Sequence, residues 1–191
     1  MEGWIRRVKG DHQGALDAFD EALQLDPNLA TAWAQKANEL VFLGRAKEAP
    51  AASARAIDLS PRDPDLGAFY FSMGRAYFTM AATSGTPQEA AAKDYDNAIQ
   101  RLQKSVQERP TTWFNRAFLI SAYALTGRLE QHEAQAALHE YREKFKNWPL
   151  DPNIKEYCAQ KRYRDAHPDF EAALQEFLRG LQIAKDTAGF P

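Results

Sequence analysis

The sequence repeats itself at a fixed distance of 34 residues. A shift by that distance superposes identical residues at five places: Gly10 on Gly44, Ala15 on Ala49, Ala22 on Ala56, Leu25 on Leu59 and Pro27 on Pro61. Self-similarity at such a distance indicates stacked repeats, and about 34 residues is the length of one helix–turn–helix unit. The period therefore predicts an all-α solenoid, in which each helix pair is stable only against its neighbours.

One complete period also carries a recognisable pattern of aromatic, small and turn-forming residues. These are Trp33, Ala37, Leu40, Gly44, Ala49, Ala56 and Pro61. With this pattern the chain resembles the tetratricopeptide repeat (TPR) family. The resemblance implies a right-handed α-α superhelix of about four helix pairs with C-terminal capping helices. It also implies a protein-interaction scaffold without catalytic activity.

The first two expected repeats lie within residues 1–63. Repeat one (1–29) leaves room for only a short first helix before a second helix over 12–25. Excision from a longer polypeptide and a naturally short capping helix both explain this beginning. Repeat two (30–63) is regular, with helices over 30–43 and 46–59, and an early proline favours a start of the second helix near Glu48.

The next two expected repeats depart from the standard pattern. Repeat three (64–112) is long, because Pro61 and Pro110 lie 49 residues apart, 15 more than one period. We expect lengthened helices there, since the segment after the central loop is rich in Ala and Glu. Repeat four (113–147) places His132 where a small residue is needed in its second helix, predicted over 129–145. A shift that brings Ala134 or Ala136 into the contact would restore close packing.

The remainder, 148–191, is expected to form a C-terminal helical cap with helices over 152–163 and 168–184. The second of these has an apolar stripe made of Phe170, Leu174, Phe177, Leu178 and Leu181. Such a stripe is typical of a helix that packs against a core along one face. Because the terminal units of a solenoid must cover its exposed ends, we expect this helix to act as the cap.

The TPR resemblance implies a binding groove lined by the first helix of each pair. The family's groove positions fall on Thr31, Ala34, Asn38 and Phe42 in repeat two, on Ala68, Phe71, Arg75 and Phe78 in repeat three, and on Phe114, Ala117, Ser121 and Leu125 in repeat four. Some TPR proteins bind a peptide's terminal carboxylate through a clamp of Lys, Asn and Arg, of which only Asn38 matches here. The expected ligand is therefore an apolar peptide or helix, with one acidic group facing Arg75. Two alternatives stay open: these aromatic residues belong to the core, or the chain's own C-terminal helix occupies the groove.

Composition and motifs exclude several other functions. The formal net charge of -2 and the pI near 6.1 favour neither nucleic acid nor an anionic membrane as a partner. Cys158 is the only cysteine, which excludes an internal disulfide and predicts a reducing, cytoplasmic location. His132 and Glu133 begin a near match to the zinc motif HExxH, but Ala136 replaces its second histidine. No nucleotide-binding motif occurs, so no cofactor or metal is expected.

The C-terminal residues carry a narrower resemblance. The segments Arg162-Tyr163-Arg164-Asp165, Phe177-Leu178-Arg179-Gly180-Leu181 and Ala188-Gly189-Phe190-Pro191 are similar to the ends of certain bacterial signalling proteins. Those proteins begin with a class III adenylate/guanylate cyclase domain or a winged-helix DNA-binding domain. The resemblance implies a C-terminal regulatory region whose active domain lies outside this chain. A third hypothesis, an enzyme with a helical site, requires a buried pair of hydrogen-bonded titratable groups in a pocket.

Overall fold

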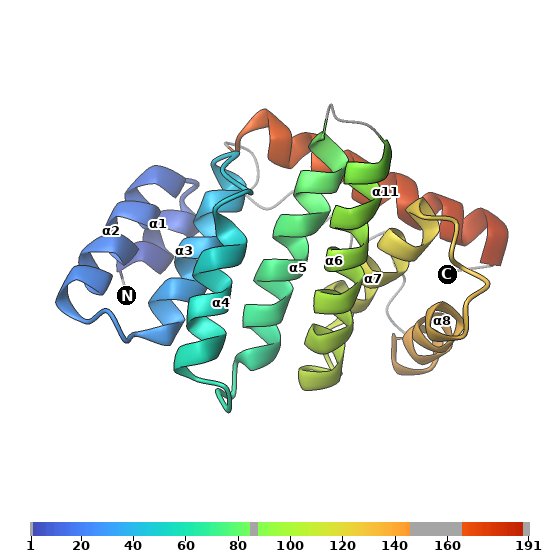
Figure 1. The fold of residues 1–191 in the computed structure, drawn as a ribbon, viewed down its shortest axis with the longest axis horizontal. Helices are drawn as coiled ribbons and strands as arrows, with labels where there is room; N and C mark the ends of the chain where they lie inside the picture. Colours follow the sequence, from blue (N-terminus) through green and yellow to red (C-terminus); the bar gives the residue numbers. More distant parts are fainter. Residues whose placement is uncertain (1, 85–87, 146–165, 189–191) are drawn as a thin grey trace.

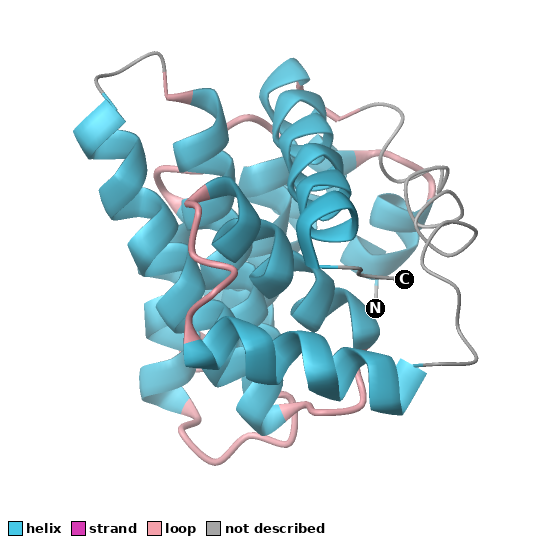
Figure 2. Ribbon diagram, turned by 90° about the vertical axis from the view of Figure 1, so that its right-hand side faces the viewer, coloured by secondary structure: helices cyan, strands magenta, loops and turns pink. Residues whose placement is uncertain are grey.

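The computed structural model describes residues 2–84, 88–145 and 166–188, and within these ranges the chain forms helices and connecting loops only (Figure 2). The helices are α1 (Glu2–Val8), α2 (His12–Leu25), α3 (Ala30–Phe42), α4 (Ala49–Leu59), α5 (Leu66–Thr83), α6 (Gln88–Glu108), α7 (Trp113–Leu125), α8 (His132–Phe145) and α11 (Pro168–Ala188). This all-α architecture confirms the predicted fold class.

Consecutive helices form antiparallel pairs that stack side by side (Figure 1). The first helices of the pairs, α1, α3, α5 and α7, make an inner layer, and their partners α2, α4, α6 and α8 make an outer layer. Each pair contacts the next, as α2 does α3 and α4 does α5. The core lies between the layers, as the period predicts.

The 34-residue period has a conformational basis at the end of the inner helices. Gly10, Gly44 and Gly127 each have a positive φ, of 85°, 74° and 68°, and each follows a first helix. The next residue then donates a hydrogen bond five residues back, as Arg45 does to the Leu40 carbonyl at 2.7 Å. This Schellman arrangement needs a left-handed residue, which glycine adopts without a Cβ penalty.

In repeat three, the inserted residues lengthen both helices of the pair. Helix α5 has 18 residues against 13 in α3, and α6 has 21 residues against 11 in α4. The five and ten extra residues match the 15-residue insertion, so the prediction of lengthened helices is confirmed. The two helices approach closely where Gly74 meets Leu102, because a Cβ on Gly74 would lie 2.9 Å from the Leu102 side chain.

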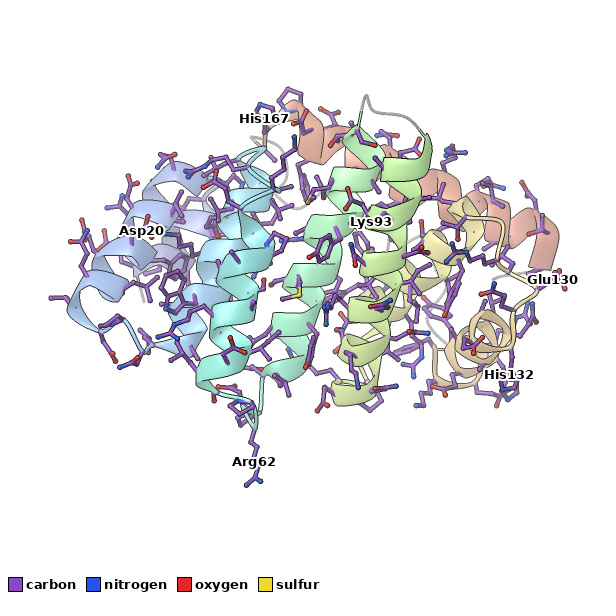
Figure 3. The ribbon with its side chains drawn as sticks, in the orientation of Figure 1. Asp20, Arg62, Lys93, Glu130, His132 and His167 are labelled. Carbon is purple, nitrogen blue, oxygen red and sulfur yellow. The ribbon has the colours of Figure 1, made fainter. Side chains whose placement is uncertain are left out.

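Two helix boundaries differ from the first expectation. Helix α4 begins at Ala49, with Glu48 as its N-cap and Pro50 in its first turn, as the proline indicates. Helix α8 begins at His132, three residues later than predicted. The His132 side chain is exposed and points to solvent (Figure 3). Ala134 is 1% exposed whereas Ala136 is exposed, as expected for the shift that turns Ala134 toward the core.

Helix α11 meets α8, the last helix of the stack, where Arg142 donates to the Ala188 carbonyl. It packs along the inner layer, on α7 and α5, and crosses behind them in Figure 1. Phe170, Phe177 and Leu181 from its apolar stripe are buried. Helix α11 therefore caps the inner wall of the solenoid. The other predicted C-terminal helix, over 152–163, falls outside the described residues.

Candidate functional site

The C-terminal half of the inner wall is covered by α11. The Phe177 ring stacks on Phe118 of α7, with ring centroids 4.1 Å apart and an interplanar angle of 14°. Ser121 Oγ donates a hydrogen bond to the Phe177 carbonyl at 2.9 Å. Gly180 permits this approach, because a Cβ there would lie 2.2 Å from Ser121 Oγ and 3.0 Å from Leu125. Two predicted groove residues, Ser121 and Leu125, thus contact the chain's own helix.

The beginning of α11 is attached to the end of α3. The His167 amide donates to the Phe42 carbonyl at 2.8 Å, and the Phe170 ring meets Phe42 edge-on at 4.8 Å. Gly44 also belongs to this junction, because a Cβ on it would lie 2.4 Å from the His167 ring. The alternative that the C-terminal helix occupies the groove therefore applies to this half of the wall.

Phe78 lies in the core between layers. Its side chain is fully buried, and its ring makes edge contacts with Tyr95 of α6 at 5.6 Å and with Phe118 of α7 at 5.4 Å. Burial also raises the pKa of the Tyr95 phenol to about 12. The core interpretation of the groove aromatics therefore applies to Phe78, and Phe42 and Phe71 are buried members of the same cluster.

A hollow of about 150 Å³ remains in the other half of the inner wall. We call it the inner hollow. It brings together six predicted groove residues, Asn38, Phe42, Ala68, Phe71, Arg75 and Phe114, and it adds Trp4, Arg7, Gln35 and Ser72. Its lining comes from the first helices of all four pairs. Its size is close to that of a protein cavity that holds one benzene ring.

Arg75 is one of the two arginines in this lining, beside Arg7. Its side chain is 3% exposed, and Nη2 donates to Asn38 Oδ1 at 2.7 Å. Its guanidinium lies 4.6 Å from the centroid of the Phe42 ring and 5.7 Å from that of Phe71. Cation–π attraction of this kind stabilises a desolvated guanidinium by about 2 kcal/mol.

A second set of buried polar groups joins α1, α2 and α3. Arg7 Nε donates to Glu39, and Arg7 Nη1 donates to Gln35 Oε1 at 2.7 Å. His12 Nδ1 lies 2.9 Å from Glu39 Oε2, and all these side chains are buried. Since neither His12 nor Glu39 lines the inner hollow, this pair does not supply the site that the enzyme hypothesis requires.

Thr31 lies apart from the other predicted groove residues. It lines a separate hollow of about 240 Å³ between α1, α2 and α3, together with Trp4, Phe19 and Leu29. Trp4 lines both hollows, so the two meet at the N-terminal edge of the inner wall.

In the described ranges, no group of three or more His, Cys, Asp or Glu side chains gathers as a metal site would require. None of the described helices has both the length and the apolar character needed to cross a membrane.

Known proteins resemble this chain in structure only. Neither a family model nor a curated protein matches its sequence. A crystal structure of MamA superposes with a TM-score of 0.60 over 98% of this chain and 97% of that one, at 19% identity. A thermophilic TPR protein in Thermus thermophilus superposes with a TM-score of 0.61 over 93% of this chain and 95% of that one, at 18% identity. The chain has a TPR-like fold.

Some residues of the inner hollow lie outside the groove positions of the TPR family. Trp4 precedes Asn38 by 34 residues, so the period itself places Trp4 on the inner wall. The period gives no signal for Arg7, because its equivalent one repeat later is the apolar Val41.

Proposed function

We propose that this chain is a protein-interaction scaffold that binds a peptide or protein segment at the inner hollow. The observation that carries the proposal is that the inner hollow lies on the inner wall beside the part that α11 covers. Helices from four pairs line the hollow. Apolar or aromatic residues make up half of its lining and polar or charged residues the other half, so the hollow combines apolar surface with hydrogen-bonding groups, as ligand sites do.

The size of the hollow determines how much of a partner it accepts. A volume of about 150 Å³ accommodates one side chain of the partner, as a benzene-sized cavity does. Trp4, 45% exposed, and half-buried Phe114 then offer aromatic surface to apolar neighbours of that side chain. Aromatic residues in such positions carry much of the binding free energy at protein interfaces.

Selection from a library of short peptides tests this proposal. Ala68 lines the hollow and is half-buried, so Ala68→Phe adds a ring to the hollow without removing a core side chain. We expect the wild-type chain to select peptides rich in apolar residues, and Ala68→Phe to bind them at least about tenfold more weakly. The matched control is Ala136→Phe, at an exposed position of α8. Equal binding by all three proteins, or no selected peptide, would contradict the proposal.

A second candidate is the regulatory region of a bacterial nucleotide cyclase or winged-helix regulator. Within the described residues, the exposed large hydrophobic side chains all lie near one end of the solenoid: Trp4, Ile5, Val8, Leu25 and Leu29. Such a patch favours contact with a further domain. The gene's upstream reading frame tests this candidate. A cyclase or winged-helix domain in the same frame supports it, and a stop codon directly before Met1 rules it out.

A further inference from the structure

The charge of Arg75 is not balanced by any carboxylate in the described part of the chain. Arg75 is 3% exposed, and Nε is buried without a hydrogen-bond partner. Among the described residues, Glu39 is the buried carboxylate, and its two oxygens already face Arg7 and His12. A buried cation is costly unless an anion accompanies it.

The surroundings of Arg75 hold its guanidinium in one orientation. Asn38 accepts from Nη2 at 2.7 Å and donates from Nδ2 to the Ala34 carbonyl at 3.1 Å, which directs its amide oxygen toward Arg75. Aromatic rings of Phe42, Phe71 and Phe170 surround the guanidinium at 4.6 to 5.7 Å. The cation is thus positioned beside the inner hollow before any ligand arrives, which lowers the entropy cost of binding.

We infer that the side chain received by the inner hollow bears a carboxylate, and that Arg75 is the residue that binds it. This inference rests on the proposed function and names the class of partner: a segment with one acidic group among apolar neighbours. Ser72 and Gln35 also line the hollow and add hydrogen-bonding capacity. The carboxylate comes from an Asp or Glu side chain or from a chain terminus, and both sources have the same chemistry.

Three small probes test the inference on the full 191-residue chain. They are N-acetyl-Phe-Glu amide, its neutral isostere N-acetyl-Phe-Gln amide, and N-acetyl-Phe-Gln with a free terminal carboxylate. Affinities are measured by NMR chemical-shift titration. We expect one of the two acidic probes to bind at least about tenfold more tightly than the neutral amide, as charge-assisted hydrogen bonds require. Which acidic probe binds identifies the source of the carboxylate.

The outcomes separate the inference from the proposed function. If all three probes bind equally well in the inner hollow, the carboxylate inference is overturned and the proposed function stands. If none binds, both fail. Because this comparison uses the wild-type protein, its result does not depend on whether a variant folds.

Variants then assign the preference to Arg75. In Arg75→Gln the acidic and neutral probes should bind equally, with folding checked by circular dichroism. Arg62→Gln is the matched control, because Arg62 is exposed at the turn between α4 and α5 and projects away from the helices (Figure 3). A preference for the acidic probe that survives in Arg75→Gln would overturn the assignment.

Discussion

At the scale of single residues, buried charges distinguish this chain from a simple alanine-rich solenoid. Glu39 is fully buried on α3, where it accepts from Arg7 of α1 and lies 2.9 Å from His12 of α2. Three helices of the first two repeats therefore meet at one carboxylate. Such a contact ties the short helix α1 to the array, although α1 has only seven residues.

The substitution Glu39→Gln tests the weight of this contact. It keeps the shape of the side chain but removes the negative charge that faces Arg7, so we expect the free energy of unfolding to fall by about 3 kcal/mol. The measurement is urea denaturation followed by circular dichroism. Asp20→Asn is the control, because Asp20 meets Lys36 at 2.6 Å in a partly exposed pair that contributes at most about 1 kcal/mol. Similar losses in both variants would contradict the special role of Glu39.

At the scale of helices, α11 is an integral part of the inner wall. Its apolar stripe was readable from the sequence, since Phe170, Phe177 and Leu181 recur at helical spacing. The sequence did not predict where α11 docks, because an apolar stripe can pack on any complementary apolar surface. The position depends on Gly180, which lets α11 approach Ser121, and on Phe118, which stacks on Phe177.

Replacing Phe177 by alanine measures how strongly α11 is held. The ring is fully buried against Phe118, so Phe177→Ala should lower the free energy of unfolding by about 3 to 5 kcal/mol. Gln175→Ala, at an exposed position of the same helix, should change it by at most about 0.5 kcal/mol. Chemical denaturation of both variants gives the comparison. A loss below about 1 kcal/mol for Phe177→Ala would show that α11 is only loosely attached.

At the scale of the whole molecule, α11 connects helix pairs that are distant in sequence. It packs on α5 and α7, and its first turn meets the end of α3 through Phe170 and Phe42. An open solenoid has contacts only between neighbouring repeats, so its repeats can unfold separately. A helix laid across three pairs links their stabilities.

Removal of α11 should therefore reduce cooperativity as well as stability. We expect the complete chain to unfold in urea with coincident midpoints by tryptophan fluorescence and by circular dichroism. A chain ending at Ala166 should lose that coincidence, because the repeats then unfold in part independently. Coincident midpoints in the shortened chain would show that neighbour contacts alone make the array cooperative.

The sequence alone was sufficient for the solenoid, because each repeat depends on local signals. Glycines at 10, 44 and 127 end inner helices, and small residues such as Ala37, Ala49 and Ala56 allow close pairing. The 15 residues by which α5 and α6 together exceed a standard pair also followed from the proline spacing. The candidate site was only half predictable: the resemblance to TPR proteins placed Asn38, Phe42, Phe71, Arg75 and Phe114 on one wall. Which of the predicted residues a ligand can reach depended on where α11 docks, and only the tertiary structure decided that, because long-range packing leaves no periodic trace in the chain.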